Sequence, residues 1–189
     1  ALNLTCNDRI TLGNNAFECC TNINNILVLA ENKFTAGDHC FLNANNIINV
    51  QITSKEVLLN DFCFSKCSRL KTFSILNGEN VSFKNKIFDS CELLTTVKVA
   101  ANANFNANNY CFQKLSNLRN VIINSSHIVF LSYCFVKCNS LRQIDCGLAN
   151  SIEYCNSSLN ERGLEFIRTE GSATLSRREE NIDPECTIQ

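Results

Sequence analysis

The chain has 189 residues, of which 45% are hydrophobic and 19% are charged, and its net charge is −1. This composition is ordinary for one globular domain with a continuous core, and the small net charge gives no electrostatic reason to expect binding to nucleic acid or to an anionic membrane surface. No apolar run approaches the roughly 18 residues that a membrane span needs, and no charged-then-apolar leader opens the sequence.

A phenylalanine recurs at nearly constant intervals along the chain. The successive intervals are 24, 23, 24, 24 and 23 residues, between Phe17, Phe41, Phe64, Phe88, Phe112 and Phe135. A fixed interval of this length is the signature of a solenoid, in which one structural unit stacks on copies of itself. Leu4 lies 13 residues before Phe17, as Ile75 does before Phe88, so the sequence is expected to begin inside a repeat, on a strand.

Each repeat carries two short apolar-polar alternations, which predict two short strands with one buried face each. The first strand precedes the Phe and carries Ile10/Leu12, Phe34/Ala36, Val57/Leu59, Val81/Phe83, Phe105/Ala107 and Ile128/Phe130. The second strand follows the Phe and carries Ile26/Val28, Val50/Ile52, Phe73/Ile75, Val97/Val99, Val121/Ile123 and Ile144/Cys146. Between them, an apolar residue three positions after the Phe predicts a single helical turn that reverses the chain.

The pattern weakens toward the C-terminus. Ile152, Tyr154 and Leu159 keep the phase of the repeat, and Leu164 and Ile167 are expected on the next second strand. Polar residues replace the Phe and Cys positions there, as a capping repeat requires. Residues 1–170 are therefore predicted to form the repeat domain, and residues 171–189 a polar tail that is extended or disordered.

The repeat resembles the BspA-like leucine-rich repeats. The segments that carry the resemblance are ITLGNNAFECC (residues 10–20), VLLNDFCFSKCSRLKTFSI (57–75) and IVFLSYCFVKCNSLRQID (128–145). The resemblance implies a mostly β, right-handed leucine-rich-repeat solenoid of about seven 23–24-residue repeats with short parallel strands. The family has a glycine after the first strand, which is present here as Gly13 and Gly37 and is replaced by Asn60 and Asn108. Because Gly and Asn both tolerate the left-handed backbone conformation, this position is expected to be left-handed.

Members of such a family are commonly microbial surface or secreted proteins used in adhesion, and the family has no catalytic residues to carry over. The resemblance thus implies a non-enzymatic module that binds a protein, such as a host-cell or extracellular-matrix protein, at the cell surface or after secretion. The alternative is a cytoplasmic scaffold for assembly. No cofactor, nucleic acid or direct membrane insertion is expected.

Eight of the thirteen cysteines occupy two repeat positions that are apolar elsewhere, so they are interpreted as small buried side chains. They are Cys40, Cys63, Cys111 and Cys134 before the Phe, and Cys20, Cys67, Cys91 and Cys138 after it. Shared zinc ligation by the two C-x-x-x-C pairs is excluded, because three rungs, about 14 Å, separate them. Disulfides between stacked neighbours, such as Cys40/Cys63, Cys111/Cys134 and Cys67/Cys91, remain the alternative. Parallel stacking holds their Cβ atoms about 4.8 Å apart, whereas a bridge prefers about 3.8 Å.

Two histidines, His39 and His127, lie at different repeat positions, four rungs apart, and are not expected to form an active site. The outward residues of the second strands instead form columns with few charges, which predicts a docking surface. The candidate binding residues are Leu27, Leu29, Gln51, Ser74, Leu76, Lys98, Ile122 and Asp145. The other reading is that neutral columns simply stack well in a solenoid. The first strands present a similar but less apolar outward set, including Leu58 and Val129.

Overall fold

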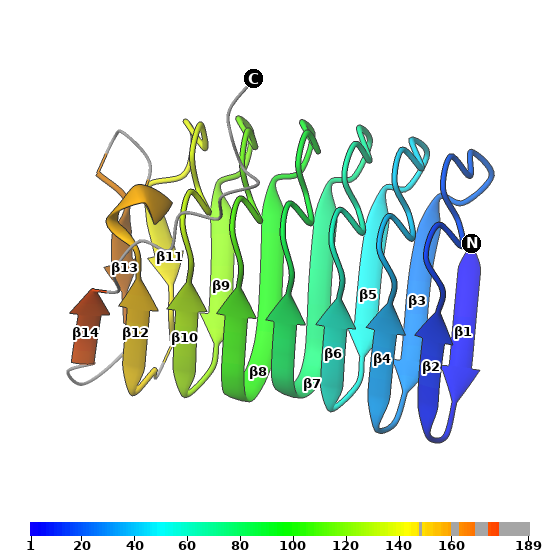
Figure 1. Ribbon diagram of the computed structural model, residues 1–189, viewed down its shortest axis with the longest axis horizontal. Helices are drawn as coiled ribbons and strands as arrows, with labels where there is room; N and C mark the ends of the chain where they lie inside the picture. The colour runs from blue at the N-terminus through cyan, green and yellow to red at the C-terminus, as the bar shows by residue number, and fades with distance from the viewer. Residues whose placement is uncertain (148, 160–162, 169–173, 178–189) are drawn as a thin grey trace.

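The chain folds as an elongated solenoid in a computed structural model that describes residues 1–147, 149–159, 163–168 and 174–177. Two parallel sheets run along the rod, one in front and one behind in Figure 1. Turns close the upper long edge, and short bends close the lower one. There are about seven rungs of near 24 residues, which confirms the predicted mostly-β solenoid.

The sheet at the back contains the second strands of the repeats. Its members are β1 (Leu2–Cys6), β3 (Asn25–Ala30), β5 (Asn49–Thr53), β9 (Asn120–Asn124), β11 (Gln143–Asp145) and β13 (Glu165–Ile167). The front sheet contains the first strands, β2 (Arg9–Leu12), β4 (Lys33–Ala36), β6 (Glu56–Leu59), β10 (His127–Phe130), β12 (Ser151–Tyr154) and β14 (Thr174–Arg177). Two longer strands, β7 (Thr72–Phe83) and β8 (Thr96–Ala107), pass through the bend and belong to both sheets.

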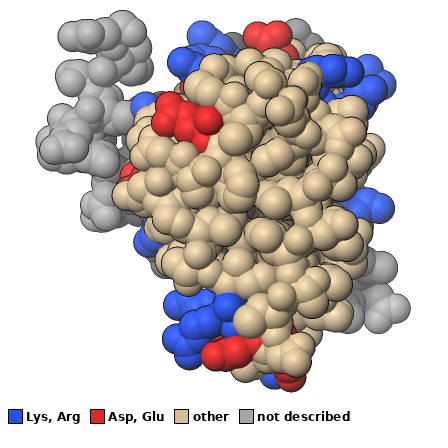
Figure 2. Space-filling view, turned by 90° about the vertical axis from the view of Figure 1, so that its right-hand side faces the viewer, with Lys and Arg blue, Asp and Glu red and all other residues tan. Residues whose placement is uncertain are grey.

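Strand register follows the sequence interval. Leu4 pairs with Val28, Val28 with Ile52 and Ile52 with Ile75, so equivalent residues of successive repeats lie side by side. Burial alternates along each strand as the pattern predicts, and Val28, Ile52 and Ile75 are fully buried. The N-terminal rung has a neighbour on one side only among the described residues. Its inward side chains are half-buried. The middle of the end face in Figure 2 shows no charged side chains, and the charged ones lie toward its margin.

The recurring phenylalanines stack into one column inside the turn edge. Neighbouring rings of Phe17, Phe41, Phe64, Phe88, Phe112 and Phe135 have centroids 4.9 to 6.1 Å apart and are nearly parallel. From Phe41 onward each ring is fully buried. The separation is widest between Phe64 and Phe88, where Phe73 of β7 packs edge-on against both rings.

The prediction of a helical turn between the first and second strands of each repeat is wrong. Each turn instead consists of tight i→i−3 bonds, such as Ser65 N–H to Phe62 O and Cys67 N–H to Phe64 O. Residues two positions before and two positions after the Phe have positive φ, as Phe62 (57°) and Lys66 (58°) do. These residues turn their N–H groups toward the next rung: Phe62, Phe64 and Lys66 donate to Asn85 O, Ile87 O and Asp89 O. The turn edge is thus a third hydrogen-bonded ladder between rungs.

The prediction of a left-handed backbone conformation directly after the first strand is also wrong. Gly13, Gly37, Asn60 and Asn108 have no positive φ. Gly37 is small for another reason, since a Cβ on it would lie 2.4 Å from Asn14 Oδ1 and 2.7 Å from the carbonyl carbon of Gly13. Because the position is not left-handed, other repeats place ordinary side chains there without backbone strain.

Small residues line the inside of the bend between the second and first strands. The column is Ala30, Ser54, Gly78, Ala101, Ser125 and Ala149, and all six are buried. Gly78 is the most constrained, because a Cβ on it would lie 2.5 Å from Ala100 O and 2.9 Å from Val81 Cγ2. The recurring small residue lets the chain pass sharply from one sheet into the other.

The C-terminal rungs depart from the repeat. After β12, a short 3-10 helix (Asn156–Ser158) takes the place of the turn, and Ser158 O accepts the Phe135 N–H. In β13, Phe166 pairs with Ile144 on the inward side, while Ile167 lies outward and 39% exposed. Ile167 is thus on the predicted strand, with its side chain outward, whereas Leu164 is buried just before the strand begins. Strand β14 pairs in parallel with β12, and residues 178–189 of the predicted tail lie outside the described residues.

Candidate functional site

The register brings the eight candidate binding residues onto the outward face of the back sheet. One column runs through paired strand positions as Leu27, Gln51, Ser74, Lys98, Ile122 and Asp145. A second column beside it begins Leu29, Thr53 and Leu76. We name this face, with its eight candidate residues, the back-sheet face. The structure therefore places the predicted residues together on one face.

The back-sheet face combines exposed aliphatic side chains with few charges. Leu29 and Leu76 are each 40% exposed and lie two rungs apart in one column, while Leu27 and Ile122 are half-buried. Its central column carries one cation, Lys98, and one anion, Asp145. A protein that docks here would desolvate little charge and would cover apolar surface.

Polar side chains beside these columns are held by hydrogen bonds between rungs. Asn49 Nδ2 donates to Asn25 Oδ1 at 2.9 Å, and Thr72 Oγ1 donates to Asn49 Oδ1 at 2.7 Å. Ser74 Oγ donates to Val50 O at 3.4 Å. The rotamers on this face are thus partly fixed before any partner arrives, which lowers the entropy cost of docking.

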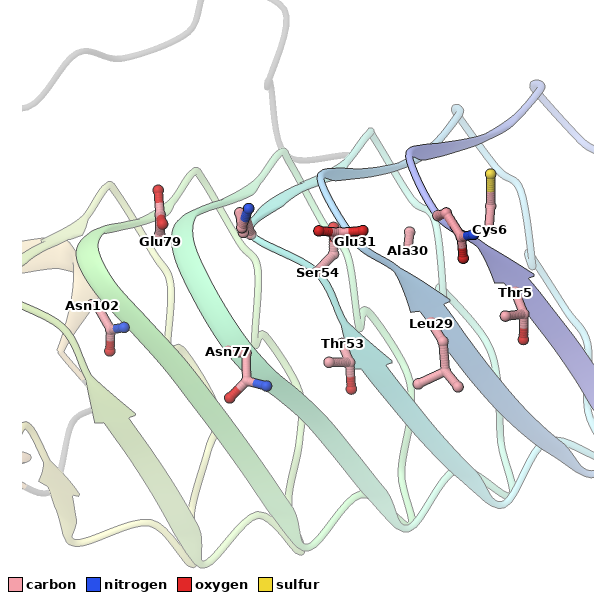
Figure 3. A pocket seen from close by; sticks show the side chains of 12 residues that line it. Thr5, Cys6, Leu29, Ala30, Glu31, Thr53, Ser54, Asn77, Glu79 and Asn102 are labelled. Carbon is pink, nitrogen blue, oxygen red and sulfur yellow. The ribbon is translucent and has the colours of Figure 1, made fainter.

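A groove runs along the bend at the edge of the back-sheet face. It has a volume of about 560 Å³, and Figure 3 shows Thr5, Leu29, Thr53, Asn77 and Asn102 in a row across successive rungs. Glu31, Lys55 and Glu79 supply its charged side chains. Only Leu29 of this set was expected from the sequence. The groove was not foreseen from the sequence. The connection from Ile75 to Val81 is one residue longer than that from Ile52 to Val57, and Asn77, which lies within it, adopts a φ of 58°.

The front sheet offers a smaller depression of about 320 Å³ on its outward face. Leu58, Ser82, Asn80 and Asn104 are among the residues that line it. Glu56 Oε1 accepts from Asn80 Nδ2 at 2.8 Å, and Asn80 Oδ1 accepts from Asn104 Nδ2 at 2.7 Å. Glu56, Asn80 and Asn104 therefore satisfy each other in a short chain of side-chain hydrogen bonds.

The repeated cysteines form columns inside the turn edge. All eight are thiols in the structure, and seven are buried while Cys20 is half-buried. Five of them donate an S–H to a backbone carbonyl of the preceding repeat, namely Cys67, Cys91, Cys111, Cys134 and Cys138. Examples are Cys67 Sγ to Phe41 O at 3.2 Å, Cys91 Sγ to Phe64 O at 3.0 Å and Cys138 Sγ to Phe112 O at 2.8 Å. Cysteine thus fills a small apolar space and also satisfies an inward carbonyl, a second role that the sequence reading missed.

These thiols are poor nucleophiles at neutral pH. Burial raises the pKa of Cys63, Cys91 and Cys111 well above the usual thiol value, and each neighbouring thiol raises it further. Burial also raises the pKa of Cys138 and of Cys146 to about 12. Within the described ranges, no three His, Cys, Asp or Glu side chains are grouped so that they could hold a metal ion.

The two histidines lie in different parts of the molecule. His39 is on the turn edge, where its ring stacks on Phe62 at 5.0 Å. His127 begins β10, and its Nδ1 lies 2.8 Å from Ser151 Oγ. The structure does not bring the two histidines together.

Asparagine and aspartate form an additional ladder that the sequence reading missed. At the end of each first strand, the side-chain oxygen accepts the backbone N–H of the equivalent residue in the next rung: Asn14 from Asp38 (2.9 Å), Asp38 from Asp61 (3.1 Å), Asp61 from Asn85 (2.8 Å), Asn85 from Asn109 (3.2 Å) and Asn109 from Ser132 (3.0 Å). The sequence contains the pattern that could have predicted this ladder, because these Asn and Asp residues recur every 23 or 24 positions.

One family model matches most of the chain. Its description is BspA type leucine rich repeat region, and its six copies cover residues 3–106 and 35–165. No curated protein and no solved structure matches the chain. In the part of the chain that the structure describes, no helix has both the length and the apolar character needed to cross a membrane.

Proposed function

Since the chain belongs to the BspA-type leucine-rich repeat family, we propose that it is a protein-binding module of a microbial surface or secreted protein and that it binds through the back-sheet face. Repeats of this family form interaction scaffolds that are typically non-enzymatic, and they are common in surface-associated or secreted bacterial proteins. The partner class is a host-cell or extracellular-matrix protein. Adhesion is the corresponding role.

The observation that carries the proposal is the pair of exposed leucines on a rigid, nearly uncharged face. Leu29 and Leu76 together with half-buried Leu27 and Ile122 provide apolar surface that does not support the core. A leucine side chain that leaves water contributes about 1.5–3 kcal/mol when it is fully buried. Strands on both sides hold the face in place, so little of that gain is lost in ordering the protein.

The bend groove extends this face. Leu29 and Thr53 border both surfaces, and the groove adds hydrogen-bonding groups from Asn77 and Asn102. A partner segment that crosses the rungs would contact apolar side chains on the sheet and polar ones at the bend. This combination of an apolar centre and a polar rim is usual at protein interfaces.

The test compares two pairs of charged substitutions. Leu29→Glu with Leu76→Glu changes the back-sheet face, and Leu58→Glu with Val129→Glu is the matched pair on the front sheet. Binding of each labelled protein to epithelial cells and to purified extracellular-matrix proteins is measured beside its thermal melt. The first pair should lose binding with an unchanged melting temperature, while the second should bind normally. Normal binding by the first pair would remove the back-sheet face from consideration.

A second candidate function is an intracellular assembly scaffold. The buried thiols favour this candidate. Cys40, Cys63, Cys67 and Cys91 are buried as free thiols, and reducing compartments keep cysteines in that form. Alkylation of the native protein, isolated from its source without reductant, separates the two candidates. Bridged cysteines would favour the secreted module, and free thiols throughout would favour the scaffold.

A further inference from the structure

Positive charge is concentrated on one part of the turn edge. Four consecutive turns, residues 60–71, 84–95, 108–119 and 131–142, contain nine Lys and Arg against three Asp and Glu, although the whole chain has a net charge of −1. The two preceding turns, residues 13–24 and 37–48, contain no Lys or Arg. We name the four cationic turns the basic turn edge. Figure 2, which looks along the rod from its N-terminal end, shows Lys and Arg at both upper corners, on the side of the turns.

Two lysines in neighbouring rungs belong to the part of this edge nearest the C-terminal end. Lys114 and Lys137 are exposed, and both occupy the left-handed position two residues after the Phe. Neighbouring rungs are about 4.8 Å apart, so the two like charges lie close together, which is unfavourable. Among the described residues, the only ion pair of the four turns joins Lys114 Nζ to Asp89 Oδ1 at 3.7 Å. Lys137 therefore has no anionic partner in that part of the chain.

The densest group of acidic residues follows the last strand. Glu179, Glu180, Asp183 and Glu185 are four of the eighteen Asp and Glu of the chain, and they fall within seven positions that contain no Lys or Arg. We name residues 179–185, which lie outside the described residues, the acidic segment. Its charge is opposite to that of the basic turn edge.

Strand β14 brings the chain to the turn side of the rod just before the acidic segment. It pairs in parallel with β12, and β12 leads into the 3-10 helix that takes the place of the turn. Both strands therefore end on the turn side, as their upward arrows in Figure 1 show. The acidic segment begins two residues after Arg177, the last residue of β14, and so starts near the turn edge.

The acidic segment is long enough to reach both lysines. Lys137 follows β10 and Lys114 follows β8, and these strands are two and three rungs from β14. At about 4.8 Å per rung, the two offsets along the rod are about 10 and 14 Å. An extended chain covers up to about 3.3–3.6 Å per residue, so it can place Glu180 about 10 Å from Arg177 and Glu185 about 26 Å from it. The carboxylates can thus lie beside Lys137 and Lys114 without any fixed match of spacing.

From this placement we propose that the acidic segment docks on the basic turn edge of the same chain and shields Lys114 and Lys137 from other anionic partners. Attachment through β14 gives the segment an effective concentration in the millimolar range, which favours it over a separate ligand in dilute solution. Carboxylates beside two neighbouring lysines also offset the repulsion between them. The contact lies at the surface, so it weakens as salt rises. It is separate from the back-sheet face.

The test measures how fast individual lysines of the intact chain react with a pulse of an acylating reagent, read by mass spectrometry. The variant Glu180→Gln/Asp183→Asn should label Lys114 and Lys137 about two- to fivefold faster than the parent, the change expected from the loss of one exposed ion pair. Lys33 is exposed on the front sheet and should keep its rate, so it is the internal reference. High salt should accelerate Lys114 and Lys137 in the parent and change little in the variant.

The matched control is Glu31→Gln/Glu79→Gln, which also removes two exposed carboxylates, but from the bend groove on the opposite long edge. It should leave the labelling rates of Lys114 and Lys137 at those of the parent. Equal rates in the parent and the Glu180→Gln/Asp183→Asn variant, or equal increases in both variants, would refute the proposal.

A second measurement identifies the chain that supplies the carboxylates. A carbodiimide joins an amine to a carboxylate in contact with it, and in the parent protein it should link the acidic segment to Lys114 or Lys137. The reaction is run on a mixture of unlabelled and nitrogen-15-labelled protein. Links within one isotopic form only would support the proposal. Links that join the two isotopic forms as often as chance mixing allows would overturn it and would identify a second copy as the source of the segment.

Discussion

Phe73 packs edge-on against Phe88, with their ring centroids 4.9 Å apart and their planes inclined by 70°. Phe73 belongs to the back-sheet part of β7, whereas Phe88 belongs to the column inside the next turn. The contact therefore joins a strand to the turn edge across successive rungs. Both rings are at most 1% exposed.

Replacing Phe88 should accordingly disrupt several rungs at once. The Phe88→Ala substitution removes a ring that contacts Phe64, Phe73, Phe83 and Phe112, and we expect it to lower the free energy of unfolding by about 3–5 kcal/mol. Urea unfolding monitored by circular dichroism measures the loss. A loss below about 1 kcal/mol would contradict the buried column, because that is the range of surface substitutions.

The ladder of asparagine and aspartate side chains predicts that two substitutions of Asp61 will differ in stability. Asp61 Oδ1 accepts the Asn85 N–H at 2.8 Å, so Asp61→Ala leaves a partly buried donor without its partner and should cost about 1–3 kcal/mol. Asp61→Asn retains an acceptor oxygen and should stay close to the parent. Chemical denaturation of both variants checks this pair. Equal stabilities would show that the ladder contributes nothing.

Two glycines predict opposite effects of an added methyl group. Gly78→Ala places a Cβ 2.5 Å from Ala100 O and should destabilise by about 1–3 kcal/mol, as overpacking of a buried site does. Gly13→Ala meets nothing within 4 Å and has no positive φ. It should be neutral or stabilise by about 0.4–1 kcal/mol, because it restricts the unfolded chain. Thermal melts of the two variants should therefore shift in opposite directions or differ by several degrees.

The cysteines should differ sharply in reactivity. Cys6 and Cys19 are exposed and should be alkylated in the native protein at pH 8, whereas Cys63, Cys91, Cys111 and the other buried thiols should react only in denaturant. Mass spectrometry after a timed pulse of iodoacetamide locates the labels. Rapid labelling of the buried set in the native protein would mean that the turn edge opens readily.

The raised thiol pKa values also predict how stability depends on pH. Burial raises the pKa of Cys138 and of Cys146 from 9.0 to about 12, so between these values the folded chain holds protons that the unfolded chain has lost. The contribution of these thiols is complete below pH 9 and is lost as pH rises toward 12. Unfolding free energies measured across this range should fall, and Cys138→Ala should make the fall shallower. An equally steep fall in the variant would assign the effect to other groups.

The sequence interval was sufficient to predict the register, and with it the back-sheet face. Stacking of Phe64 on Phe88 fixes Ser74 beside Lys98, and stacking of Phe41 on Phe64 fixes Leu76 beside Thr53. Periodicity carries this information because a parallel stack allows no other alignment of equivalent residues. The columns on the surface were therefore predictable before the structure.

Turn geometry was not predictable in the same way. Glycine is the usual marker of a left-handed residue, yet this chain places Phe62, Lys66 and Tyr110 there. Such residues pay roughly 1–2 kcal/mol each for the conformation, and hydrogen bonds to the next rung offset that cost. Those bonds exist only after stacking, so a single repeat read in isolation gives no sign of them. The bend groove also depends on several rungs at once.

The turn ladder has an electrical consequence. The backbone N–H groups of six phenylalanines donate to carbonyl oxygens of the next rung, toward the C-terminal end of the rod; they belong to Phe17, Phe41, Phe64, Phe88, Phe112 and Phe135. The peptide dipoles along this edge therefore add, as they do in a helix, whereas in the sheets they largely cancel. The rod thus has a positive pole toward its C-terminal end and a negative, carbonyl-bearing pole at the rung of β1 and β2. A long solenoid of this kind would carry a directional field along its axis in addition to the charges of its side chains.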